Sequence, residues 1–371
     1  MNKLYKIIIP MLMIIQYAGL GAIAQIIIIL FIIIELLRGV KFYLSDYDKI
    51  FIYLFSLIFL LKSINVPLSV NILLFKFYWG FLIFYIFFKL SNYKINFLNL
   101  FWISCIISVI EGLLINTIIP IGILKNIPEK HIEIISQEIT VNSFNRAYGL
   151  GSSPTVSATI IVALLSSIYQ FEREKFKEYF ILIAGIALFF LASGTGFFLF
   201  LIFVVFRYKL FKGYKFILGL TIITLIINYV LKRDINDGGV LMRLSANYFK
   251  VLYELKTIQF NEVITNISKT YNSLFLGLKY LHTSDARVMS DFGWIDFIEC
   301  FGLTGILLFI SFFIYKRISL TLTLSIIIIG CFHYPMIGSI PGQIIFAGIV
   351  IYNLNYKSKN HELQPNNDCY A

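Results

Sequence analysis

Long stretches of apolar residues that contain almost no charge constrain this chain more than any other feature. The clearest examples lie at 11–37, 51–61, 95–110, 180–206 and 295–315. A helix needs about 20 mainly apolar residues to cross the hydrocarbon core of a bilayer, and every backbone N–H and C=O inside that core must be paired within the protein. The alternation typical of a membrane β-barrel is absent from these stretches. The sequence therefore predicts an all-α fold, a polytopic integral membrane helical bundle.

The composition supports a membrane protein and argues against nucleic-acid binding. Hydrophobic residues make up 59% of the chain and charged residues 14%, whereas ordinary globular domains are about half apolar and about a quarter charged. The net charge of +11 does not indicate a nucleic-acid partner, because the basic residues lie between the apolar stretches and form no basic stripe with interleaved aromatic residues. We therefore expect membrane lipids, and no nucleic acid, as partners.

Motifs for soluble-enzyme chemistry are absent from the sequence. It contains no G-x-x-x-x-G-K-[ST], H-E-x-x-H or G-x-S-x-G pattern, so ATP, zinc and hydrolase chemistry lack support. The cysteines have no metal-ligand spacing; they are Cys105, Cys300, Cys331 and Cys369. We expect neither a cofactor nor a metal.

The apolar stretches predict about 12 transmembrane helices. Gly19 and Gly21 mark a turn inside the first long stretch, which divides it into two spans. Ser193-Gly194 does the same inside the stretch at 178–207. The expected spans are 5–20, 22–37, 50–64, 68–88, 95–119, 154–170, 178–192, 196–207, 215–231, 293–315, 318–334 and 341–356.

The positions of the basic residues orient this bundle. With the N-terminus in the cytoplasm, more than half of the 31 basic residues fall in short cytoplasmic loops and tails, as the positive-inside rule requires. We therefore expect a multi-pass protein of the bacterial inner membrane with both termini cytoplasmic. Residues 1–356 form a single transmembrane domain with two sizeable periplasmic loops at about 120–153 and 232–292, and residues 357–371 form a polar cytoplasmic tail. The larger loop has apolar residues at helical spacing and is expected to be partly helical.

A polar segment before the predicted span at 154–170 is the first candidate site. Its residues include Asn145, Arg146, Tyr148, Gly149, Gly151, Ser152, Ser153 and Pro154. Pro154 suits the first turn of a helix, with Ser152 or Ser153 as its cap. The segment is either an ordinary loop-to-helix junction or an anion site, in which Arg146 and the positive end of the helix bind a negatively charged group.

A second group of polar residues surrounds the start of the span at 293–315. Asp296 and Glu299 are three residues apart and so share one helix face. Glu299 lies about 9 Å inside the span, because six residues rise about 1.5 Å each, and an ionisable group at that depth is a functional-site hypothesis. The alternatives are a carboxylate that reaches the interface or one that pairs with a basic residue inside the bundle. Arg243, in the large loop, is either a second anion contact or a solvated arginine.

Three further charged residues interrupt apolar spans. Glu35 lies beside Arg38 near the cytoplasmic end of its span, which favours an interfacial ion pair. Lys76 and Glu111 lie inside other spans, and the sequence assigns a partner to neither of them.

The order of these motifs resembles that of the bacterial O-antigen polymerase and ligase superfamily, the Wzy-type membrane glycosyltransferases. The family pattern is an Arg-x-x-Gly segment before a helix, a Ser/Thr-Gly turn between two later helices, a long outer loop, and a helix that ends in Gly-x-x-Gly. The matching residues here are Arg146 to Gly149, Ser193 to Gly196, Arg243, Leu276 to Leu278, and Asp291 to Gly302 and Gly305. The resemblance covers roughly residues 140–315.

This resemblance implies a polysaccharide polymerase at the outer face of the inner membrane. It would transfer a growing glycan from undecaprenyl diphosphate to the next lipid-linked oligosaccharide repeat unit. Arginines can pair with the oxygens of the leaving diphosphate. The residues predicted to bind diphosphate or glycan are Arg146, Arg243, Arg287 and Tyr148. A carboxylate can orient or deprotonate the acceptor hydroxyl, and the residues predicted for this catalytic role are Asp291, as first choice, and Glu299.

The identity of residue 291 separates members of this superfamily. Ligases usually have a histidine where this chain has Asp291, which favours the polymerase over the ligase. A flippase or transporter of lipid-linked oligosaccharides is the main alternative from another class, and discontinuous helices with a central polar path would favour it. A membrane assembly partner without enzymatic activity is a third alternative. The implied protein partners of a polymerase are a chain-length regulator and a flippase.

Overall fold

Every element in the described part of the chain is an α-helix or a short 3-10 turn. The protein's structure, a computed structural model, describes residues 2–17, 21–41, 45–117, 146–210, 246–277, 293–315 and 321–362. The first helices are α1 (Asn2–Tyr17), α2 (Gly21–Leu37), α3 (Asp46–Asn65), α4 (Leu68–Trp79), α5 (Phe81–Ser91) and α6 (Phe97–Thr117). The later elements are α8 (Pro154–Phe171), η2 (Arg173–Lys175), α9 (Tyr179–Leu191), α10 (Gly194–Tyr208), α12 (Ala246–Ile267), α13 (Tyr271–Leu276), α14 (Gly293–Tyr315), α15 (Leu322–Gly330), η4 (Met336–Gly338) and α16 (Ile340–Glu362). The predicted all-α fold is confirmed for these residues.

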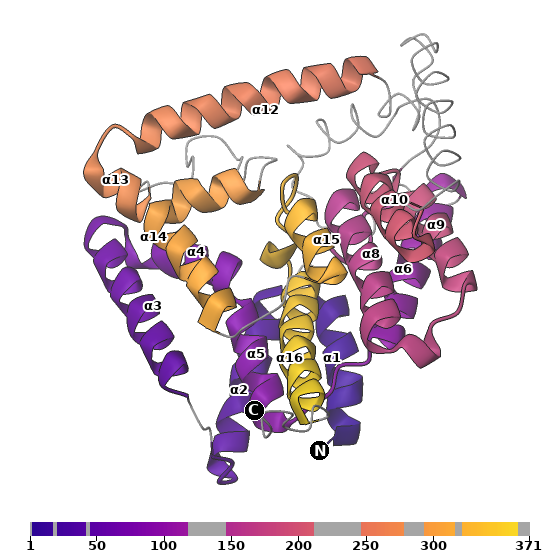
Figure 1. Ribbon diagram of the computed structural model, residues 1–371, viewed down its shortest axis with the longest axis horizontal. Coiled ribbons are helices and arrows are strands. Elements are labelled where there is room, and N and C mark those ends of the chain that lie inside the picture. Colours follow the sequence, from indigo (N-terminus) through magenta and orange to yellow (C-terminus); the bar gives the residue numbers. More distant parts are fainter. Residues whose placement is uncertain are drawn as a thin grey trace, which may run out of the picture.

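The helices form a bundle in which α16 lies between two sides (Figure 1). We call α6, α8, α9 and α10 the α8 side, and α3, α4, α5 and α14 the α14 side. The central helix α16 contacts α5 on one side and α8 on the other. One end of the bundle holds the beginning of α1 and the end of α16, whereas α12, α13 and the first part of α14 lie at the opposite end (Figure 1).

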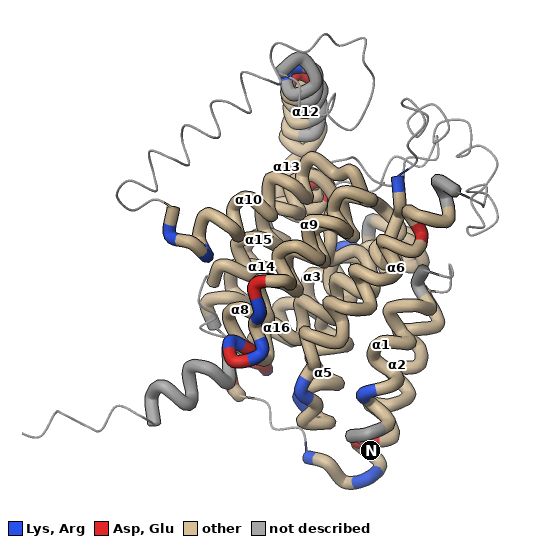
Figure 2. Tube along the Cα trace, turned by 90° about the vertical axis from the view of Figure 1, so that its right-hand side faces the viewer, with Lys and Arg blue, Asp and Glu red and all other residues tan. Residues whose placement is uncertain are grey.

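Several helices are long and apolar enough to cross a membrane. Three described helices qualify, at Phe97–Leu114, Pro154–Phe171 and Gly293–Ile314, and α4 with α5 adds a fourth if this bent pair is one span. The shorter apolar helices are α9, α10 and parts of α1, α2 and α16. Many large Ile, Leu and Phe side chains face outward, and the body of the bundle carries few charged residues (Figure 2). Extensive exposed apolar surface of this kind marks an interaction site, here suited to lipid.

The predicted spans agree with the helices in position but not in every boundary. Each predicted span within the described residues contains a helix, whereas the span at 215–231 lies outside those residues. The total of about 12 spans therefore stays a prediction. Helices α12 and α13 lie within the segment 232–292 that was expected to be partly helical. The end of α16 extends into the predicted polar tail as far as Glu362, and residues 363–371 lie outside the described part.

The predicted span at 68–88 is broken at Gly80. Helices α4 and α5 meet there with a bend of 58°. Gln343 of α16 donates hydrogen bonds to the carbonyl oxygens of Lys76 (3.1 Å) and Phe77 (3.1 Å), and Gln25 of α2 donates to Gln343 (2.9 Å). An added Cβ at Gly80 would lie 2.5 Å from the Gln343 side chain. The break therefore exists because an amide side chain of a distant helix replaces helical hydrogen bonds.

A second break divides α14 at Gly302. Its backbone angles are φ 59° and ψ −155°, a conformation that is accessible mainly to glycine. The predicted span at 293–315 coincides with α14, but this helix is kinked at Gly302, which the sequence did not predict. The predicted span at 318–334 is also shorter than expected, because α15 ends at Gly330 and a turn leads to η4.

The two sides of the bundle bury different residue types. The α8 side buries small side chains of α8, which permit close helix packing; they are Thr155, Ser157, Ala158, Thr159, Ala163, Ser166 and Ser167. The α14 side buries a cluster of aromatic rings that includes Tyr78, Trp79, Phe297 and Phe301.

The predicted ion pair of Glu35 with Arg38 is confirmed at 3.2 Å.

Candidate functional site

The Arg146 segment, residues 146–151, is attached to the end of α9. The backbone N–H of Ala147 donates to the Phe190 carbonyl oxygen (3.0 Å). The Nε of Arg146 donates to the carbonyl oxygen of Leu191 (3.2 Å), the last residue of α9. A guanidinium is favourable at this position because the C-terminal end of a helix carries partial negative charge. The arginine predicted to bind the substrate is thus half-buried and held against a helix end.

Glu111 of α6 holds the same segment from the other side. Its carboxylate is buried and accepts hydrogen bonds from the backbone N–H groups of Tyr148 (3.1 Å) and Gly149 (2.6 Å). Charge-assisted bonds of this kind compensate part of the cost of burying a carboxylate. Sequence reasoning gave Glu111 no role, although an acidic residue inside an apolar span signals a functional or structural site. In the structure Glu111 positions the Arg146 segment.

The glycine of the Arg-x-x-Gly motif has a local structural reason. Gly149 has φ +63°, and an added Cβ would lie 2.7 Å from the side chain of Ser157. The Ser157 hydroxyl donates to the Tyr148 carbonyl oxygen (2.5 Å) and accepts from the Gly151 N–H (2.8 Å). The first residues of α8 thereby fix the turn that carries Arg146 and the half-buried Tyr148.

The Ser193 turn lies beside the start of α8. The hydroxyl of Ser193 donates to the Thr155 hydroxyl (3.3 Å) and accepts from the Gly196 N–H (3.2 Å), which caps α10. An added Cβ at Gly196 would lie 2.3 Å from Cβ of Ala158. The structure therefore brings together two motifs that are about 45 residues apart in the sequence.

The predicted cap of α8 is only partly correct. Pro154 occupies the first turn of α8, as predicted. Ser153, one of the two predicted cap residues, is the N-cap residue, but its side chain makes no cap hydrogen bond. Ser152 instead has a left-handed conformation with φ 56°.

The Arg146 segment lies at the end of α6 that is remote from the end of α16. At the near end, Phe97 at the start of α6 and Phe171 at the end of α8 contact Tyr352 of α16, with ring centroids 5.0 and 5.6 Å apart. Glu111 lies about 21 Å further along α6 than Phe97, at about 1.5 Å per residue. The Arg146 segment and the C-terminal part of α16 therefore lie at opposite ends of the bundle.

The first half of α14 carries the second group of predicted site residues. Asp296 and Glu299 are both buried, with Glu299 only 5% exposed, which argues against a carboxylate that reaches the interface. The hydroxyl of buried Tyr78 lies in electrostatic range of both carboxyl groups. The indole of Trp294 donates to the Ile328 carbonyl oxygen of α15 (2.8 Å), so the start of α14 lies near the end of α15.

The Gly302 break places α14 directly against α13. An added Cβ at Gly277 (φ +77°) would lie 2.4 Å from the Cys300 carbonyl oxygen, and one at Gly302 would lie 2.5 Å from the Leu274 carbonyl oxygen. Lys62 of α3, which is buried, donates to the carbonyl oxygens of Leu276 (3.0 Å) and Cys300. Gly277 and the Gly-x-x-Gly motif are therefore in contact. Sequence reasoning missed Lys62, which donates to a carbonyl oxygen next to the break.

Three predicted site residues lie outside the described part of the chain: Arg243, Arg287 and Asp291. Within that part, the structure places Arg146 and Tyr148 together on the α8 side and Glu299 on the α14 side. The described residues hold no group of three His, Cys, Asp or Glu side chains that is suited to a metal ion.

The geometry defines an all-helical bundle with helices that can cross a membrane and with polar sites bounded by glycines. No protein-family model, curated protein or solved structure gives a significant match to this chain.

Proposed function

We propose that this protein is a membrane-embedded glycosyltransferase, an O-antigen or surface-polysaccharide polymerase of the bacterial inner membrane. The observation that carries the proposal is the construction around Arg146. The Arg-x-x-Gly segment is fixed by Glu111, Ser157 and the end of α9, and it lies beside the Ser193 turn. Two of the motifs that carry the resemblance in sequence, the Arg146 segment and the Ser193 turn, thus form one local structure.

The proposed reaction replaces a bond to phosphate with a glycosidic bond. The anomeric carbon of the growing glycan loses its bond to the diphosphate oxygen and forms a bond to a hydroxyl of the acceptor sugar. Undecaprenyl diphosphate leaves, with its charge stabilised by Arg146 together with Arg243 and Arg287. A carboxylate, Asp291 or Glu299, accepts the proton of the acceptor hydroxyl. No nucleotide sugar is needed, because the lipid diphosphate already activates the glycan.

The proposal includes an orientation in the membrane. The Arg146 segment would face the periplasm, and both chain termini would lie in the cytoplasm, with about 12 spans in total. The arrangement supports this orientation, because α1 begins and α16 ends at the same end of the bundle (Figure 1). The loop between α2 and α3, the last turn of α5 and the loop that follows it add basic residues there, among them Arg38, Lys41, Lys89 and Lys94.

Substitution of Arg146 tests the diphosphate role. A strain that lacks the protein is complemented with Arg146→Ala, Arg146→Lys or the matched control Arg173→Ala, which changes an exposed arginine at the other end of α8. We expect Arg146→Ala to abolish the polysaccharide ladder in gels. The lysine variant should retain only a fraction, because lysine cannot bind phosphate in the bidentate manner of arginine. A normal ladder from Arg146→Ala at equal membrane level contradicts the proposal.

A flippase for lipid-linked glycans is the second candidate. It is favoured by the breaks at Gly80 and Gly302, since discontinuous helices are frequent at transporter binding sites. The glycan phenotype of a deletion separates the candidates. A single repeat unit on the final acceptor indicates a polymerase, polymer stranded on the lipid carrier indicates a ligase, and loss of all surface glycan indicates a flippase.

A further inference from the structure

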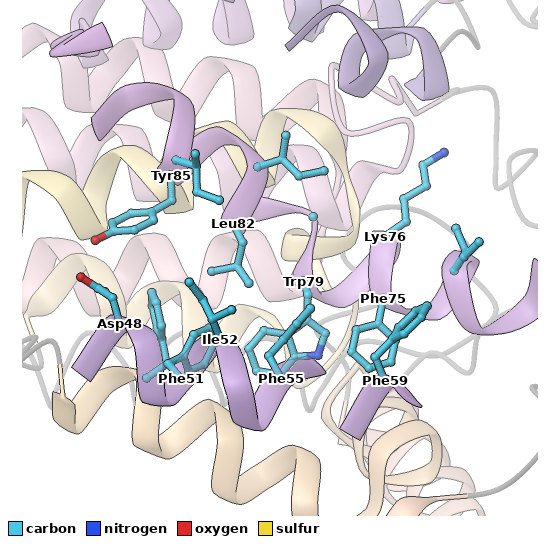
Figure 3. Close-up of a pocket in the computed structure, with 15 residues that line it drawn as sticks. Asp48, Phe51, Ile52, Phe55, Phe59, Phe75, Lys76, Trp79, Leu82 and Tyr85 are labelled. Atoms are coloured by element: carbon cyan, nitrogen blue, oxygen red, sulfur yellow. The ribbon is translucent and has the colours of Figure 1, made fainter. Parts of the chain in front are cut away.

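A lateral apolar groove runs between α3, the α4–α5 pair and α14 (Figure 3). Its volume is about 420 Å³. Aromatic rings form much of its lining; they are Phe51, Phe55, Phe59, Phe75, Trp79, Tyr85 and Phe312. Two further lining residues, Ile52 and Ile72, are 42% and 50% exposed, so the groove opens on the outer surface of the bundle where lipid would lie.

The length of the groove suits part of a long hydrocarbon chain. It follows α3 from Asp48 to Phe59, which is about 17 Å at about 1.5 Å per residue. The hydrocarbon core of a bilayer is about 30 Å thick. A lipid chain in the groove would therefore contact the protein over about half of that thickness.

The two charged residues of the groove differ in their surroundings. Asp48, at one end, accepts from the Ser45 hydroxyl (2.8 Å) and pairs with Lys89 (3.5 Å). The ammonium group of Lys76 makes no hydrogen bond or ion pair with any described residue, although its backbone carbonyl oxygen accepts from Gln343. Its ammonium nitrogen points away from Phe59 and Phe75 (Figure 3). The groove thus offers a positive charge beside an apolar channel, a combination that fits the phosphate and the chain of one lipid.

We propose that this groove binds the isoprenoid chain of a second lipid-linked substrate, with the phosphate of that lipid facing Lys76. This inference rests on the proposed polymerase function, because the transfer needs a donor and an acceptor that are both attached to lipid carriers. The Arg146 segment is held by α6, α8 and α9, whereas the groove lies on α3, α4, α5 and α14. The donor diphosphate therefore belongs to the α8 side, and the acceptor lipid belongs to the groove on the α14 side.

The single channel favours an isoprenoid lipid over a glycerophospholipid. A polyprenyl carrier lipid has a single hydrocarbon chain, which matches the single groove. A glycerophospholipid carries two chains and would leave one of them outside. The test below therefore compares the two lipids directly.

The experiment measures lipid binding to the purified full-length protein by native mass spectrometry, with undecaprenyl phosphate and phosphatidylglycerol as probes. Leu82→Trp fills the groove from α5, and Ile52→Trp fills it from α3. The matched control is Leu182→Trp on α9, which is 67% exposed and lies outside the groove. A further variant, Lys76→Gln, removes the charge but keeps most of the side chain.

We expect the wild type and Leu182→Trp to bind undecaprenyl phosphate more tightly than phosphatidylglycerol. Either groove-filling variant should weaken undecaprenyl phosphate binding at least tenfold, and Lys76→Gln should weaken it roughly tenfold, the value of one charge-assisted hydrogen bond. Unchanged binding in both filled variants overturns the inference, and so does equal binding of the two lipids by the wild type.

Complementation separates a failure of this inference from a failure of the proposed function. If Arg146→Ala abolishes the polysaccharide ladder while both groove-filling variants still make the ladder and still bind undecaprenyl phosphate, the groove assignment alone is wrong. If deletion of the protein leaves the ladder at its normal length, the polymerase function is wrong. If the groove-filling variants are present in the membrane at normal levels but produce only short polysaccharide chains, this result supports both the groove assignment and the polymerase function.

Discussion

The two sides of the bundle use buried polar groups in different ways. On the α8 side, continuous helices present Glu111 and Ser157 to a loop, and these side chains fix the backbone around Arg146. On the α14 side, the helices themselves are broken, and Lys62 and Gln343 bond carbonyl oxygens at the breaks. One side therefore uses intact helices to shape a loop, whereas the other uses long side chains to replace part of its helical hydrogen bonding.

This difference has a physical basis in the residues that each side buries. Small residues of α8 allow its neighbours to approach closely, so polar groups can reach the adjoining loop. Around α14 the aromatic rings fill the space between helices and the backbone must bend to pack against α13. In an apolar surrounding each carbonyl that loses its helical partner needs another donor.

The largest effect should come from Gly277→Ala on the α14 side. The new Cβ would lie 2.4 Å from the Cys300 carbonyl oxygen, and φ is +77°, so we expect a loss of about 3 kcal/mol or more in stability. Gly39→Ala is the matched control, since Gly39 has φ +79° with no atom within 4 Å, and should cost about 1 kcal/mol. Thermal unfolding of the detergent-purified protein measures both. Equal losses would show that the α13–α14 contact is loose.

The next effect should come from Lys62→Met. This change keeps the length of the side chain and removes the donor to the Leu276 and Cys300 carbonyl oxygens, which should cost about 2 kcal/mol because buried carbonyls are left unpaired. Lys49→Met, at an exposed position of the same helix, is the control and should leave Tm unchanged. A stable Lys62→Met protein would mean that the break at Gly302 does not depend on this lysine.

A smaller effect is expected on the α8 side from Glu111→Gln. The amide oxygen can still accept from the Tyr148 and Gly149 N–H groups, but the bonds are no longer charge-assisted, so the loss should be about 1 kcal/mol. The polysaccharide ladder should shorten more than this loss of stability explains, because the Arg146 segment loses its fixed position. A normal ladder would contradict a positioning role for Glu111.

The smallest effect should come from Asp46→Asn at the exposed start of α3. Asp46 pairs with Lys49 at 2.8 Å, but exposed ion pairs contribute little to stability. We expect no measurable change in Tm at physiological ionic strength. A clear decrease would indicate that the end of the bundle near α3 is less solvated than its exposure suggests.

The sequence predicts the positions of the helices better than it predicts their breaks. The apolar residues that predict a helix, and the charged residues that mark its ends, lie within or next to that helix. The helices α6, α8 and α9 are therefore found where they were expected. The bend at Gly80 depends on Gln343, more than 250 residues away, and the residues on either side of Gly80 are apolar and contain no proline. The joint at Gly302 depends in the same way on Lys62 and α13, and no local pattern encodes such distant donors.

The contact between Gly277 and Gly302 has a mechanical consequence. Main chain meets main chain there, with no intervening side chain that could change rotamer and absorb a displacement. Helix α12 also contacts both α13 and α14, so the three helices pack together across one end of the molecule. A force applied to α12 would be transmitted to the half of α14 that carries Glu299, with Gly302 as its pivot.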